Sequence, residues 1–356
     1  MNDLQASLNP VLYAENGFLE LNEFLKNERP SKIFILVDSN THEYCLSKFL
    51  QRLENDILTE VIEIEAGEEF KNLQTCEGVW NVLSELEADR KSLMINLGGG
   101  VVTDLGGFVA SCFKRGIKFI NVPTTLLSMV DASVGGKTGV DLGNLKNQIG
   151  IIIQPEMVVI ETSFLETLSS REMRSGLAEI LKHGLIADEN YWKKVTNLAD
   201  LDLSDLDEII RDSVNIKAAI VKKDPFEKNL RKTLNYGHTL GHAIESFCLT
   251  NEKREKLLHG EAIAAGMILE TYISTVLLDF PQEKLQNVHE VIKNMYGKER
   301  FDEEEIVAIK ELMKFDKKNE RGNINFVLLR DIGDAAIDIT VPDTVIDDAF
   351  KYYLIH

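Results

Sequence analysis

Three histidines and one glutamate in the second half of the chain could bind a divalent metal ion. His238 and His242 are four residues apart and would share one face of a helix. His259 begins a later helical stretch, and Glu179 lies in an earlier one. One carboxylate with two imidazoles is the usual ligand set of a catalytic zinc site that keeps a coordination position open. The spacing leaves open which three of the four bind, and the absence of an H-E-x-x-H sequence excludes a zincin protease.

A glycine-rich turn in the first half could approach a phosphate group. The apolar stretch at residues 93–97 runs into three glycines, Gly98, Gly99 and Gly100, and a helical stretch follows. Glycines at such a turn let backbone N–H groups reach a pyrophosphate at a helix N-terminus. The standard G-x-G-x-x-G fingerprint fails because Thr103 occupies its last position, so a simple strand-to-helix turn is the alternative interpretation.

Two polar residues follow the earlier apolar stretch at residues 33–37. Asp38 or Asn40 could accept a hydrogen bond from a ribose hydroxyl at this place. The same Asp-Ser-Asn sequence is also ordinary turn chemistry.

A second glycine-rich stretch contains Gly136-Lys137-Thr138, as a nucleoside-triphosphate loop does. The required upstream glycine is missing, because Asp131 stands in its place. We therefore exclude nucleoside-triphosphate hydrolysis. Lys137, together with Lys146 and Asn147, suits an anionic or polyhydroxylated ligand.

Several basic residues lie beside these segments in an otherwise acidic chain. They are Arg115, Lys137, Lys146, Lys182, Lys217, Arg231 and the pair in Asp316-Lys317-Lys318. Solvated surface charge is the default interpretation for any one of them. Their repeated position beside Gly, His and Asn favours a pocket for a phosphate and a carboxylate. We expect Lys137, Lys217 and Arg231 to be exposed, so that their replacement would leave folding stability nearly unchanged.

The elements that must position these residues change in kind along the chain. Strands are predicted at residues 33–37, 61–64, 93–97, 119–122 and 157–160, with helical stretches such as 73–86 between them. This alternation is typical of a parallel sheet with crossover helices, a Rossmann-like α/β domain. Later periodic stretches predict helices at residues 171–186, 203–222, 234–247, 261–277, 283–295 and 304–314. A late strand pair is predicted at 323–329 and 336–341, around Gly333.

The length of 356 residues suggests two domains, because single hydrophobic cores usually stop growing at about 250–300 residues. We predict an N-terminal NAD-binding α/β domain at 1–161 and a helical metal- and substrate-binding domain at 162–356, closely packed and with a cleft between them. The net charge of −19 disfavours nucleic acid as a partner.

Neither a signal sequence nor a membrane span is predicted. The N-terminus lacks the basic start and apolar core of a signal peptide, and no window has about 18 uncharged apolar residues. The four cysteines are far apart, with no C-x-x-C pair, and are expected to be reduced. A cytoplasmic location is expected.

Five ordered segments resemble the 3-dehydroquinate synthases, a family of sugar-phosphate cyclases, over nearly the whole chain. They are GGGVVTDLGGF at 98–108, RGIKFINVPTTLLSMVDASVGGKTGVD at 115–141, REMRSGLAEILKHG at 171–184, LRKTLNYGHTLGHAIE at 230–245 and LLHGEAIAAGM at 257–267. The resemblance implies an N-terminal Rossmann-like α/β domain, a C-terminal helical domain and an active site between them with NAD and a divalent metal, Zn²⁺ or Co²⁺. It also implies a homodimer.

The resemblance also implies roles for residues. Glu179, His238 and His259 would bind the metal, which leaves His242 to contact substrate. The NAD site would comprise Asp38, Asn40, Glu68, Lys71, Gly99, Gly100, Val101, Asp104, Thr124, Thr125, Asp131, Lys137, Lys146, Phe164, Thr167 and Leu168. Substrate would be held by Arg115, Lys137, Asn147, Lys182, Lys217, Arg231, Asn235, His242 and Lys317.

Two loops depart from the pattern of the family. Many members have Pro-Gly-Gly-Glu where this chain has Glu-Ala-Gly-Glu at 65–68, and Pro-Leu-Gly where it has Gly-Asn-Leu at 143–145. These departures concern the neighbourhood of Glu68 and Lys146.

The activity implied is conversion of 3-deoxy-D-arabino-heptulosonate 7-phosphate to 3-dehydroquinate and phosphate in the shikimate pathway, which leads to chorismate and the aromatic amino acids. The steps would be transient NAD-dependent oxidation, phosphate elimination, reduction, ring opening and aldol cyclisation, which makes the protein a carbon-oxygen lyase. Another sugar-phosphate cyclase, a metal-dependent polyol dehydrogenase and a non-enzymatic NAD-binding protein with a structural zinc are the alternatives.

Overall fold

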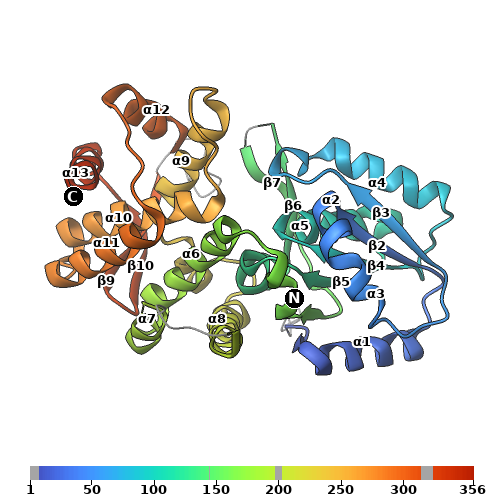
Figure 1. The fold of residues 1–356 in the computed structure, drawn as a ribbon. Helices are drawn as coiled ribbons and strands as arrows, with labels where there is room; N and C mark the ends of the chain where they lie inside the picture. Colours follow the sequence, from blue (N-terminus) through green and yellow to red (C-terminus); the bar gives the residue numbers. More distant parts are fainter. Residues whose placement is uncertain (1–7, 144, 197–202, 314–323) are drawn as a thin grey trace. The chain divides into compact units, whose positions relative to one another are not determined.

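The computed structural model describes residues 8–143, 145–196, 203–313 and 324–356 (Figure 1). The chain divides into two compact units, Met1–Met173 and Arg174–His356, whereas the sequence predicts a boundary at 161. The first unit is α/β and the second is largely helical, which confirms the predicted fold class.

A six-stranded parallel sheet forms the centre of the first unit. Its order is β1-β8-β5-β4-β2-β3. The bounds are β1 Val11–Tyr13, β2 Ile33–Asp38, β3 Thr59–Ile64, β4 Leu93–Gly98, β5 Lys118–Pro123 and β8 Val158–Ile160. Every residue of β2 and β4 is buried, as expected for central parallel strands covered on both faces. The edge strand β3 instead alternates buried and exposed positions toward its end.

Helices connect these strands and bury their side chains. They are α1 Ala14–Glu28, α2 Ser39–Thr41, α3 Ser47–Leu50, α4 Leu73–Glu85 and α5 Gly100–Cys112. Short helical segments occur at His42–Leu46, Glu68–Phe70, Phe113–Arg115, Ser128–Ala132 and Thr162–Thr167. Side chains of α4 and α5 pack with Phe34, Leu36 and Met94 of the sheet in one apolar cluster.

A hairpin that the sequence analysis missed follows β5. Strands β6 (Lys137–Leu142) and β7 (Leu145–Ile152) pair antiparallel, and β6 packs against α5. Lys137 therefore begins a strand, whereas a nucleoside-triphosphate loop leads into a helix. The exclusion of such a loop is confirmed.

The second unit is built around one apolar helix. Its elements are α6 Ser170–Ala187, α7 Glu189–Thr196, α8 Leu203–Lys223, a 3₁₀ segment Leu230–Asn235, α9 His238–Thr250, α10 His259–Leu278, α11 Gln282–Tyr296, α12 Glu303–Met313, β9 Asn325–Asp331, β10 Asp334–Thr340 and α13 Asp343–Ile355. Helix α10 contacts α9, α11, α13 and β9. It is long and apolar enough to cross a membrane by composition, but 67% of that window is buried, as in the core helix of a globular unit.

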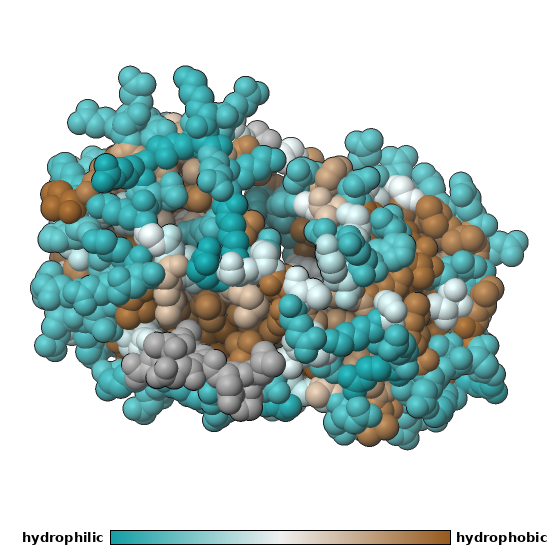
Figure 2. All heavy atoms as spheres, in the orientation of Figure 1, coloured by the Kyte–Doolittle hydropathy of each residue, from teal (hydrophilic) through white to brown (hydrophobic). Residues whose placement is uncertain are grey.

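The surface agrees with the acidic composition. On the face drawn in Figure 2, hydrophilic side chains cover much of each unit, and apolar residues break the surface in smaller areas. The many carboxylates of the chain account for this hydrophilic surface, because Asp and Glu side chains are almost never fully buried unless they are paired.

Candidate functional site

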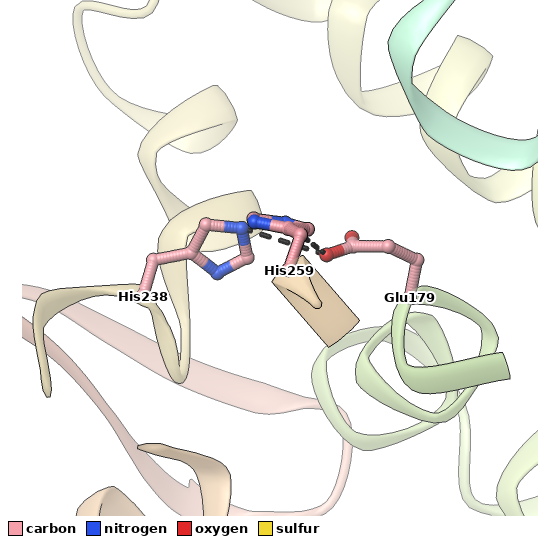
Figure 3. A group of neighbouring side chains, drawn as sticks. All are labelled: Glu179, His238 and His259. Carbon is pink, nitrogen blue, oxygen red and sulfur yellow. Dashed lines mark ion pairs between the residues drawn. The ribbon is translucent and has the colours of Figure 1, made fainter. Parts of the chain in front are cut away.

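Glu179, His238 and His259 converge inside the second unit, from three different helices (Figure 3). The Nε2 atoms of His238 and His259 lie 3.5 and 3.4 Å from the same oxygen, Oε1 of Glu179. Three ligands in a tetrahedral site with metal-ligand bonds of about 2.0–2.1 Å would be separated by about 3.4 Å. The donor set and its spacing therefore fit a divalent metal ion.

The far side of each donor group is also engaged. Glu179 Oε2 pairs with the ammonium of Lys182, one turn further along α6. His238 donates from Nδ1 to the carbonyl oxygen of Tyr236 at 3.0 Å, which assigns its Nε2 lone pair to the cluster. The Nδ1 atom of His259 lies 3.4 Å from Glu245 Oε2. Each donor is therefore oriented before any ion arrives.

Two glycines allow the three helices to approach at backbone distance. A Cβ atom at Gly260 would lie 2.0 Å from the carbonyl oxygen of Ser175 in α6. A Cβ atom at Gly266 would lie 2.0 Å from the carbonyl oxygen of Gly237, at the start of α9. Helix α10 is thereby held against the helices that carry Glu179 and His238.

A buried carboxylate fixes the first turn of α9, where His238 is the first helical residue. Glu270 of α10 accepts hydrogen bonds from the backbone N–H groups of Gly237 at 2.7 Å, Thr239 at 3.0 Å and Leu240 at 3.1 Å. The first N–H groups of any helix have no partner within the helix. Glu270, which is 33 residues from Gly237 in the sequence, supplies that partner.

The third imidazole, His242, stands beside the cluster. Its ring centroid is 5.0 Å from that of His238 and 5.8 Å from that of His259.

Burial opposes the charged form of His259, but the carboxylates of Glu245 and Glu179 raise its pKa to about 9. These carboxylates therefore favour positive charge beside them, whether it is carried by a proton or by a metal cation.

The predicted substrate cations of the second unit are buried, which makes the expectation of exposed side chains wrong for Lys217 and Arg231. Lys182 and Arg231 are each 1% exposed and Lys217 is 5% exposed. Arg231 donates from Nη1 to the carbonyl oxygen of Pro225, and its backbone N–H donates to Asp224. Large buried cations are costly to place in a core without anionic or polar partners. Their replacement should therefore affect folding as well as binding.

Glu227, which the sequence does not indicate as a site residue, lies in the same loop. Its Oε1 accepts a hydrogen bond from Nδ2 of Asn235 at 2.9 Å. Glu227 has a positive φ of 56°, a conformation that L-residues adopt at a cost of about 1–3 kcal/mol. Asp224 holds this loop by accepting backbone N–H bonds from Lys228, Asn229 and Arg231. No feature of the sequence alone indicates this loop geometry.

The nucleotide candidates of the first unit gather at the carboxyl ends of β2, β4 and β5. Strand β2 pairs with β3 on one side and β4 on the other, so the chain reverses direction across the sheet between β2 and β4. Open parallel sheets bind ligands at such a switch point. Asp38 ends β2, Gly99 and Gly100 begin the turn into α5, and Thr124 and Thr125 follow β5.

Asp38 also has a structural role. Its Oδ1 accepts from the backbone N–H of Thr41 at 2.8 Å and caps the short helix α2, on which Asn40 is exposed.

Lys71 connects other members of the predicted NAD and substrate sets. Its ammonium donates to Asp104 Oδ2 at 2.6 Å and to Asn147 Oδ1 at 2.8 Å. Burial alone would lower the pKa of Lys71, but Asp104 and neighbouring carboxylates raise it, so the cation is retained. Asn147 has a φ of 52° and donates its backbone N–H to Asp141. The pair Lys146–Glu68 lies 3.1 Å apart, so the two atypical loops contact each other.

The remaining predicted residues divide into those near these strand ends and those elsewhere. Val101 and Asp104 lie in the first turns of α5, Asp131 in the segment after β5, and Phe164, Thr167 and Leu168 in or next to the segment Thr162–Thr167. Gly99 precedes the N-terminal end of α5 and Arg115 is exposed beyond its C-terminal end; the 13 residues of this helix span about 20 Å at about 1.5 Å per residue. The chain therefore does not bring Arg115 to the glycine turn. Lys317 lies outside the described residues.

The family models and the relatives that match this chain name the same family. Residues 61–175 match the 3-dehydroquinate synthase N-terminal family, and residues 176–319 match the 3-dehydroquinate synthase C-terminal family. A 3-dehydroquinate synthase of Parabacteroides distasonis is 43% identical over 336 residues, 94% of each chain. One of Helicobacter pylori is 41% identical over 327 residues, 92% of this chain and 93% of its own.

Solved structures share the fold at lower identity. A 2-epi-5-epi-valiolone synthase from Streptomyces hygroscopicus, with NAD⁺ and Zn²⁺ bound, has a TM-score of 0.85 at 24% identity, covering 99% of this chain and 98% of its own. A 2-deoxy-scyllo-inosose synthase with carbaglucose-6-phosphate, NAD⁺ and Co²⁺ has a TM-score of 0.83 at 23% identity, covering 97% and 96%. The matched segments, the identity and the coverage agree, and the chain belongs to the 3-dehydroquinate synthase family.

Proposed function

We propose that the protein is a 3-dehydroquinate synthase, which converts 3-deoxy-D-arabino-heptulosonate 7-phosphate to 3-dehydroquinate and phosphate. The observation that carries the proposal is the convergence of Glu179, His238 and His259 within a unit that also buries Lys182, Lys217 and Arg231. Relatives of this name are about 40% identical over more than 90% of the chain, which supports it.

Glu179, His238 and His259 would hold Zn²⁺ or Co²⁺, and His242 would stay available to substrate. The ion would supply Lewis-acid stabilisation of substrate oxygens, while NAD⁺ would accept a hydride and return it. Buried Lys217 and Arg231, with Asn235, are suited to hold carboxylate and phosphate groups through charge-assisted hydrogen bonds. Arg115 and Lys317 stay predictions for the same role.

NAD would lie along the carboxyl ends of β2, β4 and β5. The pyrophosphate would approach the backbone at Gly99 and Gly100, and Asp38 would accept a ribose hydroxyl through its carboxylate. Lys71 would keep Asp104 and Asn147 in place.

NAD⁺ is expected to act substoichiometrically, because its hydride is returned within each cycle. The protein is incubated with the heptulosonate phosphate, Zn²⁺ and one tenth of an equivalent of NAD⁺. We expect complete conversion to 3-dehydroquinate by NMR, with inorganic phosphate released in equal amount and no growth of absorbance at 340 nm. Growth of that absorbance mole for mole with product would contradict the proposal and indicate a polyol dehydrogenase.

A related cyclase that acts on another sugar phosphate is the second candidate. The two solved structures of similar fold are named 2-deoxy-scyllo-inosose synthase and 2-epi-5-epi-valiolone synthase. A hexose 6-phosphate serves as the matched substrate control. Faster phosphate release from the hexose phosphate than from the heptulosonate phosphate would favour that candidate.

Arg231→Lys is expected to lower kcat/KM by about a hundredfold, or ~2.7 kcal/mol, because lysine keeps the charge but loses the planar two-pronged donor. The Nη1 bond to Pro225 is also lost, so the thermal midpoint should fall. The measurement compares steady-state kinetics and thermal unfolding with and without inorganic phosphate, which should stabilise the parent more than the variant. A variant with kcat/KM within twofold of the parent would place the substrate site elsewhere.

We further propose a cytoplasmic homodimer. Strand β7 pairs only with β6 among the described residues, and Leu142, Leu145, Ile151 and Ile152 of this hairpin are exposed apolar side chains. Such an edge and apolar surface are suited to a second copy of the chain. Light scattering of the purified protein measures the assembly.

A further inference from the structure

Glu245 lies next to one of the candidate metal ligands, His259, at the ring nitrogen that does not face Glu179. It lies on α9 at 4% exposure, seven residues after His238 and three after His242, so the three side chains share one face of the helix. Its Oε2 atom is 3.4 Å from Nδ1 of His259, while Nε2 of the same ring is 3.4 Å from Glu179 Oε1. The two nitrogens of His259 thus face two different carboxylates.

Only one nitrogen of a neutral His259 can carry the proton, so the other nitrogen is left to bind an ion. A neutral imidazole carries one proton, and a carboxylate accepts a hydrogen bond but cannot donate one when ionised. With the proton on Nδ1 facing Glu245, the lone pair lies on Nε2 and points to the cluster. His238 has the same arrangement, with the carbonyl oxygen of Tyr236 in place of the carboxylate.

Glu245 could instead be a ligand, because His242, Glu245 and His259 also lie within 4.8 Å of one another through their ligand atoms. The two sets share His259, and its Nε2 is directed at Glu179. The set with Glu179 has both histidine Nε2 atoms near one oxygen at 3.4 and 3.5 Å, as one ion requires. The geometry favours one ion on Glu179, His238 and His259, with Glu245 outside it.

We propose that Glu245 is a positioning residue for the metal: it holds the proton of His259 on Nδ1, keeps the ring oriented and so presents Nε2 to the ion. The proposal rests on the metal site given under the proposed function. Partners behind ligating histidines typically contribute about 10–100-fold to metal affinity.

The test measures Co²⁺ affinity of the full chain by competition with a chromophoric chelator, together with the number of ions bound. Four variants are compared with the parent: Glu245→Ala, Glu245→Gln, His259→Ala and the surface control Glu252→Gln, which removes one exposed charge. We expect about 10–100-fold weaker binding for Glu245→Ala and a smaller loss for Glu245→Gln, whose amide oxygen can still accept a hydrogen bond from Nδ1–H of His259. Glu252→Gln should bind as the parent does, and one Co²⁺ should bind per chain.

A second readout separates positioning from a general structural effect. In nitrogen-15 NMR of the histidine rings of the Zn²⁺-loaded protein, the Nδ1–H signal of His259 should shift in Glu245→Ala, whereas that of His238, whose Nδ1 faces the carbonyl oxygen of Tyr236, should not. The visible spectrum of the Co²⁺ protein should change in the same variant.

The outcomes distinguish the inference from the function on which it rests. If His259→Ala loses Co²⁺ but Glu245→Ala binds within twofold of the parent, the positioning role is wrong and the metal site stands. If His259→Ala binds Co²⁺ as the parent does, the metal site itself is wrong. Two ions per chain, one of them lost in Glu245→Ala, would make Glu245 a ligand and overturn the proposal.

Discussion

His238→Ala and His259→Ala are each expected to lose the bound metal and nearly all turnover. Binding free energies of about 10–16 kcal/mol, shared among the four ligands of a structural zinc site, correspond to about 2.5–4 kcal/mol for each ligand, or a loss of about seventyfold to a thousandfold in affinity. Both Nε2 atoms lie beside Glu179 Oε1, so either substitution removes one of the three donors of the cluster. Metal content after dialysis, by atomic emission, and phosphate release measure the two effects.

His242→Ala is the matched control for these variants. It removes an imidazole from the same helix face, 5.0 Å from the ring of His238, without removing a predicted ligand. The variant should retain one metal ion per chain while its turnover falls. Loss of metal from His242→Ala, with retention in His259→Ala, would mean that the ligand set is wrong.

Glu270→Ala is expected to destabilise the second unit by at least ~3 kcal/mol, because it leaves three buried N–H groups of α9 without their acceptor. Each such group costs about 1–3 kcal/mol. For a unit of this size the midpoint of thermal unfolding should fall by about 10 °C.

Thermal and urea unfolding of the metal-free chain provide the measurement, which excludes any contribution from bound ion. Glu270→Gln should lie between parent and alanine variant, because its oxygen can accept two of the bonds while its amide group opposes the third donor. Glu290→Ala, at an exposed position of α11, should unfold within ~0.5 kcal/mol of the parent. A Glu270→Ala midpoint equal to that of Glu290→Ala would show that water or another group replaces the carboxylate.

Much of the sheet could be predicted from the sequence because its central strands are continuous apolar runs. The predicted stretches at 33–37 and 93–97 each fall one residue short of β2 and β4. The hairpin β6–β7 could not be predicted in this way. Its strands contain Gly139, Gly150 and several polar residues, so they show neither an apolar run nor a clear alternation.

The start of α9 shows why the candidate site was only partly predictable. Periodicity suggested a helix from residue 234, but the chain is 3₁₀ up to Asn235 and passes through Gly237 at a φ of 78° before α9 begins at His238. The cap of this turn is Glu270, a partner distant in sequence, and local spacing carries no information about it.

The four metal candidates illustrate the same limit. Helical spacing favoured His238 with His242 as neighbours, and that pair does lie on one face. His259 and Glu179 reach the ring of His238 because helices α6, α9 and α10 cross there. The crossing depends on which small residues of these helices contact one another. Burial of Lys182 and Arg231 was likewise invisible, because a charged residue has the same sequence pattern whether its partners are solvent or protein.

The backbone contact at Gly266 has a consequence for any attempt to change the ion that the protein prefers. Since α9 and α10 touch main chain to main chain there, the separation of the two imidazoles does not depend on the bulk of the apolar side chains around them. Enlarging or trimming those side chains would leave the spacing of the two helices, and so of the two imidazoles, unchanged. A sphere wide enough for a larger cation with longer bonds requires the two helices themselves to move apart, and residue 266 is the place where a single added methyl group would force that separation.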